Sequence, residues 1–174
     1  TVGERRDPNT EGAFNYDPNR WVLVPSTAKR RLPIQAEREK SLKAESEASL
    51  WNVVEQGSDK RVGFVTSGPG YLHVKEAFPH APVMKLGLSH PAPFEAIRAF
   101  AGTVERLVVV EETEKILETE LKAEGIGCTG KDILPSNGEL APEILAPAIA
   151  KFLGEPVPVR KVAHDASTLF PRPP

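Results

Sequence analysis

Residues 63–71 constrain the fold of this chain more than any other segment. They read GFVTSGPGY, a short apolar run that ends in small residues and passes directly into a helix-like pattern. The same order of apolar run and turn recurs at 83–87 and at 107–112. Strands with few polar interruptions that alternate with amphipathic helices are typical of a mostly parallel sheet covered on both faces. The sequence therefore predicts an α/β fold, and such sheets bind ligands or partner chains at the carboxyl ends of their strands.

Length and composition are those of an ordinary globular domain. The chain has 174 residues, of which 40% are apolar and 26% charged, and it suits one domain with an appendage. A net charge of −2 gives no general attraction for nucleic acid or an anionic membrane. No apolar run approaches the roughly 20 residues that span a bilayer. The start of the sequence lacks the apolar core of a signal peptide, and one cysteine excludes an internal disulfide. These features predict a cytoplasmic protein without nucleic-acid or membrane partners.

The chain is predicted to have three parts. Residues 1–57 form an irregular segment and then a long charged helix at 33–56, whose apolar stripe is narrow. Residues 58–155 carry the strand and helix patterns, and residues 156–174 are a Pro-rich linker toward a following cofactor-binding domain. Strands are expected at 61–66, 82–86, 104–110 and 126–129, and helices at 71–78, 93–102, 113–125 and 140–153. The third of these strands is the most hydrophobic and is expected at the centre of the sheet.

The turn after the first predicted strand is the first candidate site. Backbone N–H groups at a helix N-terminus favour anions, so this turn could bind a phosphate group. It is not a P-loop, because it lacks Gly-Lys-Ser/Thr and Pro69 removes one donor, and it is not a GxGxxG fingerprint. A glycine-rich turn that serves only close packing is the alternative, and the missing elements favour it.

Charged residues after later strands are the other candidates. Glu111 and Glu112 end the third predicted strand, where one of them could act as a general base or bind a partner's cation. Alternatively, both stabilise the next helix N-terminus, for which Thr113 is the expected cap, and this second interpretation is favoured. Lys131 and Asp132 could form an interdomain ion pair or a plain surface pair. The candidate set at the strand-end crevice is therefore Thr66, Ser67, Gly68, Gly70, Gly87, Glu111, Glu112, Lys131 and Asp132.

The sequence contains no complete catalytic motif and no metal-binding pattern. The four histidines show neither His-x-x-x-His nor Glu-x-x-His spacing. Cys128 lies near apolar Ile126 without an evident cationic neighbour that would lower its thiol pKa, which favours a buried, inert thiol. A Gly-x-Ser-x-Gly elbow is also absent. We therefore predict no catalytic residue and no metal site in this chain.

Four ordered stretches carry a resemblance to a known family. They are DPNRWVLVP at 17–25, GFVTSGPGYLHVKEA at 63–77, VMKLG at 83–87 with VEE at 110–112, and GKDILPSNGEL at 130–140. Together they resemble the middle domain of the thiamine diphosphate-dependent 2-oxoacid:ferredoxin oxidoreductases, among them the alpha subunits of indolepyruvate ferredoxin oxidoreductases. The final PRPP resembles the lead-in to that family's Cys-Pro-Gly-Cys segment. The resemblance spans most of the chain, from about residue 14 onward.

The resemblance implies a fold and a role. It implies a three-layer α/β/α unit like the transketolase C-terminal domain, with a mostly parallel sheet of about five strands. The whole enzyme is implied to decarboxylate a 2-oxoacid such as indolepyruvate oxidatively to an acyl-CoA, with thiamine diphosphate, magnesium and iron–sulfur clusters, and to reduce ferredoxin. This segment lacks the family's Gly-Asp-Gly and clustered cysteines, so it is expected to bind none of these cofactors and to be inactive alone.

The implied role is that of a structural and interface domain. Its expected partners are the other domains of the same subunit and a second subunit or protomer. A small-ligand module, in which the turn at 66–70 binds coenzyme A or a nucleotide phosphate, is the alternative that the residues leave open. A free-standing adaptor is a third possibility. The sequence does not select one 2-oxoacid among indolepyruvate, phenylpyruvate and related aryl acids.

Overall fold

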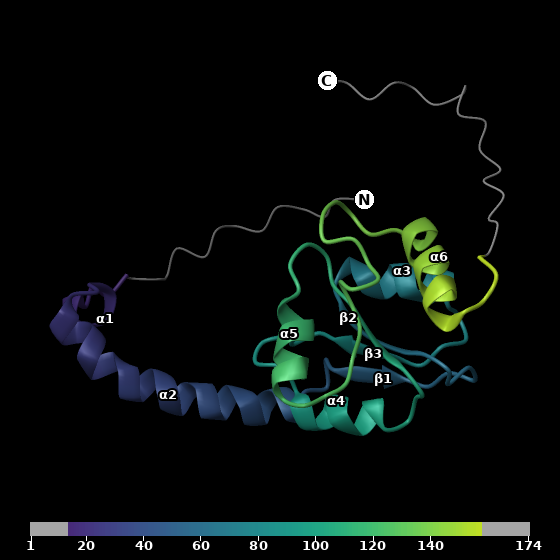
Figure 1. Cartoon of the computed structure of the whole chain (residues 1–174). Coiled ribbons are helices and arrows are strands. Elements are labelled where there is room, and N and C mark those ends of the chain that lie inside the picture. The colour runs from purple at the N-terminus through teal and green to yellow at the C-terminus, as the bar shows by residue number, and fades with distance from the viewer. Residues whose placement is uncertain (1–13, 158–174) are drawn as a thin grey trace, which may run out of the picture. The chain divides into compact units, whose positions relative to one another are not determined.

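The computed structural model in Figure 1 describes residues 14–157. The chain divides between Ser41 and Leu42 into two compact units. The first contains the short helix α1 (Pro18–Trp21) and most of the charged helix α2 (Pro25–Glu47). The second begins in the last turns of α2 and contains every later element. From residue 158 onward, the predicted Pro-rich linker lies outside the described residues.

The second unit is built on one four-stranded sheet of order β1-β3-β2-β4. The strands are β1 (Val53–Glu55), β2 (Gly63–Ser67), β3 (Val83–Leu86) and β4 (Leu107–Val110). The helices are α3 (Pro69–Ala77), α4 (Phe94–Ala101), α5 (Ile116–Ala123) and α6 (Pro142–Leu153). β3, β2 and β4 are parallel, and β1 pairs with β3 in the antiparallel sense. The prediction of an α/β fold with a mostly parallel sheet is confirmed.

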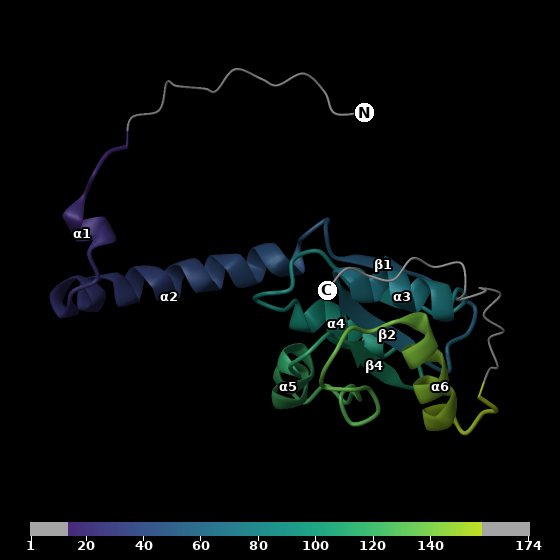
Figure 2. The ribbon, with the colours of Figure 1, turned by 90° about the horizontal axis from the view of Figure 1, so that it is seen from above.

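Helices cover both faces of the sheet. α3 and α6 pack on one face and α4 and α5 on the other, which gives three layers (Figures 1 and 2). The strands supply both cores by simple alternation, because successive side chains of a strand point to opposite faces. In β2, Phe64 joins the core under α3 and α6, whereas Val65 joins the core under α4 and α5. Strands buried on both faces explain the continuous apolar runs in the sequence.

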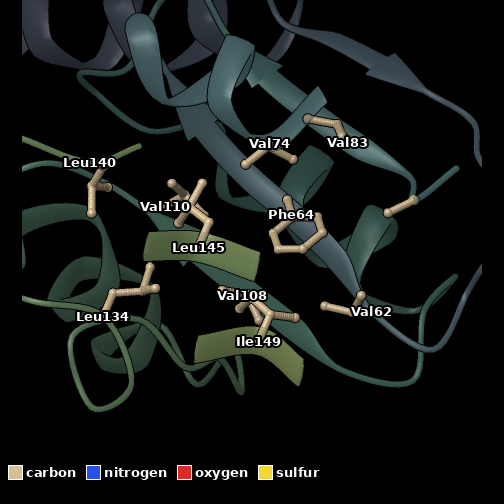
Figure 3. Packing of buried hydrophobic residues seen from close by; sticks show 11 residues of the cluster. Val62, Phe64, Val74, Val83, Val108, Val110, Leu134, Leu140, Leu145 and Ile149 are labelled. Atoms are coloured by element: carbon tan, nitrogen blue, oxygen red, sulfur yellow. The ribbon is translucent and has the colours of Figure 1, made fainter. Parts of the chain in front are cut away.

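Phe64 lies at the middle of the core beneath α3 and α6 (Figure 3). Its side chain is fully buried, and its ring stacks on that of Phe78 with the centroids 5.1 Å apart. Val74 of α3 and Ile149 of α6, both with no exposed area, lie in the same cluster. Phe64 thus joins the central strand to both helices of this layer.

The predicted charged helix at 33–56 is wrong at both ends. α2 begins eight residues earlier, at Pro25, and contains Pro33 in its interior rather than at its start. It ends at Glu47, and Val53–Glu55 leave the helical pattern to form the edge strand β1. A strand of three residues is too short to show an alternation of apolar and polar side chains. It also pairs with β3, about thirty residues later in the chain, so local sequence does not reveal it.

The sheet also differs from the prediction at its other edge. The expected strand at 126–129 is reduced to one parallel bridge between Val108 and Thr129. Thr129 accepts a bond from Val109 N (2.8 Å) and donates to Leu107 O (3.0 Å), so this segment lines β4 without forming a full strand. β4 is not the central strand, because β2 and β3 occupy the middle of the order. The apolar sequence of β4 reflects the burial of both of its faces and does not indicate a central position in the sheet.

A charged contact fixes the edge strand β1 to helix α3. Lys75 Nζ lies 2.9 Å from a carboxylate oxygen of Glu55, and the Tyr71 hydroxyl donates to the same carboxylate. These two bonds, Lys75 first, hold the pKa of Glu55 below its usual 4.5 despite partial burial. A carboxyl whose folded-state pKa is depressed stabilises the fold above its unfolded-state pKa, and that contribution is lost as the pH falls through the folded-state value.

We expect Lys75→Met to remove a small, pH-dependent part of the stability. Both side chains are about one-third exposed, so the loss should stay below about 1 kcal/mol at pH 7. It should shrink below pH 4.5, where Glu55 becomes protonated in the unfolded chain and then in the folded one. Urea unfolding of both proteins at pH 7 and pH 3 measures this. An equal difference at the two pH values would contradict the assignment.

Candidate functional site

A pocket of about 480 Å³ lies at the carboxyl ends of the parallel strands. Its walls are the turn between β2 and α3, the segment after β4, the start of α5, and two residues of the loop after β3. Of the candidate set, it brings together Ser67, Gly68, Gly70, Glu111 and Glu112. It leaves out Thr66, Gly87, Lys131 and Asp132. The crevice predicted from the strand order therefore exists, with about half of the proposed residues in its lining.

The turn between β2 and α3 is shaped by packing. Thr66 is fully buried, and its hydroxyl donates to the carbonyl oxygen of Val110 at 2.8 Å, which ties the end of β2 to the end of β4. A Cβ at position 70 would lie 2.6 Å from that hydroxyl oxygen, so glycine is required there. Gly68 has a positive φ of 54° and caps α3 without a side-chain bond. The close-packing interpretation accounts for Thr66 and Gly70 without a ligand.

Glu111 caps helix α5. Its carboxylate accepts bonds from the backbone N–H groups of Ile116 (3.2 Å), Leu117 (2.9 Å) and Glu118 (3.1 Å). The expected cap, Thr113, has instead a φ of 57° in the connecting turn, and the helix begins three residues after it. The helix-terminal role that the sequence favours for Glu111 is confirmed, but Glu111 rather than Thr113 is the cap. A carboxylate with three such donors is held in place and is not a free general base.

Replacing Glu111 with alanine should destabilise the chain by about 1–2 kcal/mol, as for the loss of a good helix cap. The loss leaves Leu117 N and Glu118 N without their side-chain acceptor, and Ile116 N keeps the carbonyl oxygen of Glu114. Glu114 is the matched control, since it is an exposed glutamate of the same turn that accepts from Ile116 N through its backbone carbonyl rather than its carboxylate. Urea unfolding should show Glu114→Ala within about 0.5 kcal/mol of the parent chain. Equal losses for the two variants would contradict the capping role.

Lys131 and Asp132 hold the loop after residue 129 in place. The Lys131 ammonium donates to the carbonyl oxygens of Glu111 and Pro135, the latter at 2.9 Å. Asp132 lies 3.1 Å from Lys122 Nζ, which lowers the pKa of its carboxyl. Each side chain therefore has partners within its own unit, where the sequence left open an interdomain pair or a surface pair. Glu112 was expected at the N-terminus of α5 together with Glu111, and this is wrong: its carboxylate accepts a bond from Leu140 N, at 3.1 Å, in the segment before α6.

Glu118 is a buried charge that the sequence reasoning missed. It is 1% exposed, its carboxylate lies 2.5 Å from Lys122 Nζ, and it accepts a bond from Lys131 N at 2.8 Å. The bonds that the Lys122 ammonium donates to Glu118, the larger cause, and to Asp132 raise the pKa of Lys122. The i,i+4 spacing of Glu118 and Lys122 was the only signal in the sequence, and that spacing usually marks an exposed pair. The thiol of Cys128 packs nearby, and burial raises its pKa, which agrees with an inert thiol.

The pocket is acidic. Four glutamates line it: Glu111, Glu112, Glu114 and Glu120. His90 lies at its rim, with Nδ1 3.7 Å from a carboxylate oxygen of Glu120. Carboxylates at this density repel a phosphate group and attract a cationic one. Residues 14–157 contain no group of three or more His, Cys, Asp or Glu residues that could hold a metal ion, and no helix among them is long and apolar enough to cross a membrane.

Comparisons with known proteins identify relatives of the chain, although no family model matches it. The indolepyruvate oxidoreductase subunit IorA of Thermococcus kodakarensis is 31% identical over 180 residues, and that of Methanothermobacter thermautotrophicus is 33% identical over 187 residues. The alignments cover 94% and 99% of this chain. They cover 28% and 30% of the relatives, so the chain spans less than a third of the length of the curated relatives it matches.

A solved structure has a similar fold. It is the 2-oxoglutarate:ferredoxin oxidoreductase from Magnetococcus marinus, in a structure with 2-oxoglutarate, coenzyme A and succinyl-CoA bound. The TM-score is 0.54 at 20% identity, over 75% of this chain and 24% of that one. The α/β fold is therefore that of a domain of this enzyme. The resemblance identified from the sequence is confirmed by the IorA relatives.

Proposed function

We propose that this chain is the middle domain of a 2-oxoacid:ferredoxin oxidoreductase subunit whose substrate is indolepyruvate or a related arylpyruvate. The observation that carries the proposal is sequence similarity to IorA subunits over 94–99% of the chain but only 28–30% of their length. Similarity that fills one chain and a fraction of the other is what a domain of a longer protein gives. The complete enzyme would convert the 2-oxoacid to an acyl-CoA and reduce ferredoxin. The proposal keeps the cytoplasmic location that the sequence predicts.

The described residues do not fit the cofactors of such an enzyme. Thiamine diphosphate, magnesium and iron–sulfur clusters would need phosphate-binding groups, oxygen ligands for a metal, or several thiolates. The carboxylates of the strand-end pocket are possible oxygen ligands, but those of Glu111 and Glu112 already accept backbone N–H bonds, and residues 14–157 contain no cluster of three or more His, Cys, Asp or Glu residues for a metal ion. The single Cys128 is half-buried, and burial raises the pKa of its thiol. We therefore assign the cofactors to other parts of the full-length enzyme.

The role left to this domain is to position its neighbours. A rigid sheet buried on both faces can hold two adjoining domains at a fixed distance and orientation, which is a real contribution to the rate of a reaction between groups they carry. Its partners would be the other domains of the same subunit, a second subunit or protomer, and ferredoxin as the acceptor for the whole enzyme. No side chain of residues 14–157 is assigned to contact the substrate.

Binding of coenzyme A or a nucleotide in the pocket is the second candidate. The position of the pocket beside the N-terminus of α3 favours it. The four lining glutamates oppose it. Calorimetric titration of this chain with coenzyme A should show no saturable binding. Micromolar binding that is lost in Gly68→Val would instead establish the ligand module.

Turnover by the complete enzyme tests the proposed function. The full-length subunit should be purified with its partner subunit, without oxygen, and supplied with thiamine diphosphate, magnesium, coenzyme A and ferredoxin. We expect reduction of ferredoxin that depends on indolepyruvate or phenylpyruvate and on coenzyme A. 2-Oxoglutarate is the contrasting substrate, and this chain alone is the control that should give no turnover. Turnover by the 174-residue chain alone, or no activity of the complete enzyme with any aryl 2-oxoacid, would contradict the proposal.

A further inference from the structure

The corner between α2 and β1 displays two large apolar side chains on a rigid backbone. Leu50 is 92% exposed and Trp51 is 77% exposed, in a unit whose other large apolar side chains are mostly buried. We infer that Leu50 and Trp51 form a docking contact that inserts into an apolar socket on another domain of the same, longer polypeptide. This inference rests on the proposed place of the chain within a longer subunit, and it names the surface that makes the contact.

The backbone of Trp51 is clamped to the end of β3. Its carbonyl oxygen accepts a bond from Gly87 N at 3.1 Å. The side-chain oxygen of Asn52 accepts bonds from Gly87 N and Leu88 N, both at 3.0 Å. A Cβ at position 87 would lie 2.6 Å from the Trp51 carbonyl oxygen, so the close approach needs glycine. Gly87 was predicted as a pocket residue, but its place in the structure is to hold Trp51.

The residues just before this corner are anchored as well. Ser46 is fully buried, and its hydroxyl donates to the carbonyl oxygen of Pro91 at 2.6 Å. The carboxylate of Glu47 accepts bonds from Glu95 N and Ala96 N, both at 3.0 Å, at the start of α4. The Asn52 side chain donates back to the carbonyl oxygen of Ser46 at 3.0 Å. The two exposed side chains therefore project from a backbone that two other elements hold in place.

Rigidity and composition both suit a protein contact. A mobile segment loses backbone entropy when binding orders it. A backbone that is already fixed in the free protein avoids that cost. Tryptophan is also the residue type most enriched among the energetic centres of interfaces. The seven residues at 48–54 carry no charge in a chain in which 26% of residues are charged. Interface cores are depleted of charged residues in the same way.

The occupant is argued from the size of the relatives. More than two thirds of the length of each IorA relative lies outside the match to this chain, so a longer parent would contain a large surface that the structure does not describe. A domain on the same polypeptide is present at a high effective concentration, which favours its docking over that of a separate molecule. Extension of the sheet by a second copy is disfavoured, because the edge strand β1 has only three residues.

Photo-crosslinking in the full-length subunit tests this contact. The residue p-benzoylphenylalanine replaces Trp51 in one variant and Leu50 in another, so that one failed variant does not decide the result. After irradiation, we expect a cross-link to a peptide outside residues 1–174, in a product with the mass of one subunit. A product with the mass of two copies, a cross-link to a different subunit, or no cross-link at either position would overturn the inference. The cross-link is detected by mass and does not require an active enzyme, so the contact and the proposed activity are tested separately. A subunit that is cross-linked within itself but inactive would support the contact and contradict the proposed activity.

A substitution pair gives an independent readout. Leu50→Ser with Trp51→Ser should speed hydrogen exchange in the cross-linked segment by about tenfold or more, because that segment loses its docked partner. Leu72→Ser is the matched control: Leu72 is an apolar residue of α3 that is 65% exposed and lies outside the corner. Unchanged exchange in the double variant, or the same increase in both variants, would overturn the inference.

Discussion

Phe64→Ala is expected to lower the free energy of unfolding by about 3–5 kcal/mol, the range for removing a buried phenylalanine ring. The side chain has no exposed area and stacks on Phe78 with the ring centroids 5.1 Å apart. It also fills the space between β2 and the helices α3 and α6, where Val74 and Ile149 have no exposed area (Figure 3). Close-packed neighbours relax little into such a void, so the transfer and cavity costs add.

Urea unfolding followed by circular dichroism measures this loss. Phe64→Leu is the control, because it keeps most of the volume and should cost less than about 1.5 kcal/mol. Since total domain stabilities are about 5–15 kcal/mol, the alanine variant should be partly or fully unfolded at 37 °C. A loss below 1 kcal/mol for Phe64→Ala, with an unchanged urea dependence, would show that this core is not packed as described.

Glu118→Ala has the second largest expected effect, a loss of about 2–3 kcal/mol. The substitution removes the acceptor of Lys131 N and opens a void at a position that is 1% exposed. It also removes a carboxylate that lies 2.5 Å from Lys122 Nζ. The loss should stay below the 3–5 kcal/mol seen for a fully buried pair, because the Lys122 side chain is 44% exposed and keeps its hydration.

Glu118→Gln separates the two contributions. The amide oxygen can still accept from Lys131 N, whereas the amide nitrogen replaces the oxygen that faces Lys122 Nζ. The volume and the backbone bond are kept and the contact with Lys122 is lost, so we expect a smaller cost of about 1 kcal/mol. Chemical denaturation of both variants at pH 7 is the measurement. A glutamine variant as unstable as the alanine variant would show that the charge, rather than the backbone bond and the volume, dominates.

The parallel core could be predicted from the sequence because its signals are local. The strands at 63–67, 83–86 and 107–110 are short apolar runs, each followed by a turn, and the helices between them have regular apolar spacing. Phe94, Ile97 and Phe100 on α4 illustrate this, and the latter two are buried. Buried helices and strands with a regular apolar spacing can be recognised from local sequence, without knowing which elements they pack against.

The parts that were not predicted depend on contacts between distant segments. The cap of α5 comes from Glu111, at the end of the preceding strand, because the turn places its carboxylate over the helix start and leaves Thr113 at a positive φ. Propensity alone favoured threonine at that position. β1 forms because three residues meet β3, and Glu118 is buried because a later loop closes over it. The position of the candidate pocket could be predicted from the ends of the strands. Local sequence could not show that Lys131 lies outside the pocket lining and donates to two backbone carbonyl groups.

The Thr66 hydroxyl occupies the space that a side chain at position 70 would need. The residue types allowed at positions 66 and 70 therefore depend on each other. Alanine at position 70 would place its methyl group 2.6 Å from that hydroxyl oxygen, while the carbonyl oxygen of Val110 would remain at 3.3 Å. Alanine at position 66 removes the nearer obstacle and also the bond to Val110. The two positions should therefore vary together among natural sequences with this turn: threonine with glycine, or alanine with alanine, while threonine with alanine stays rare.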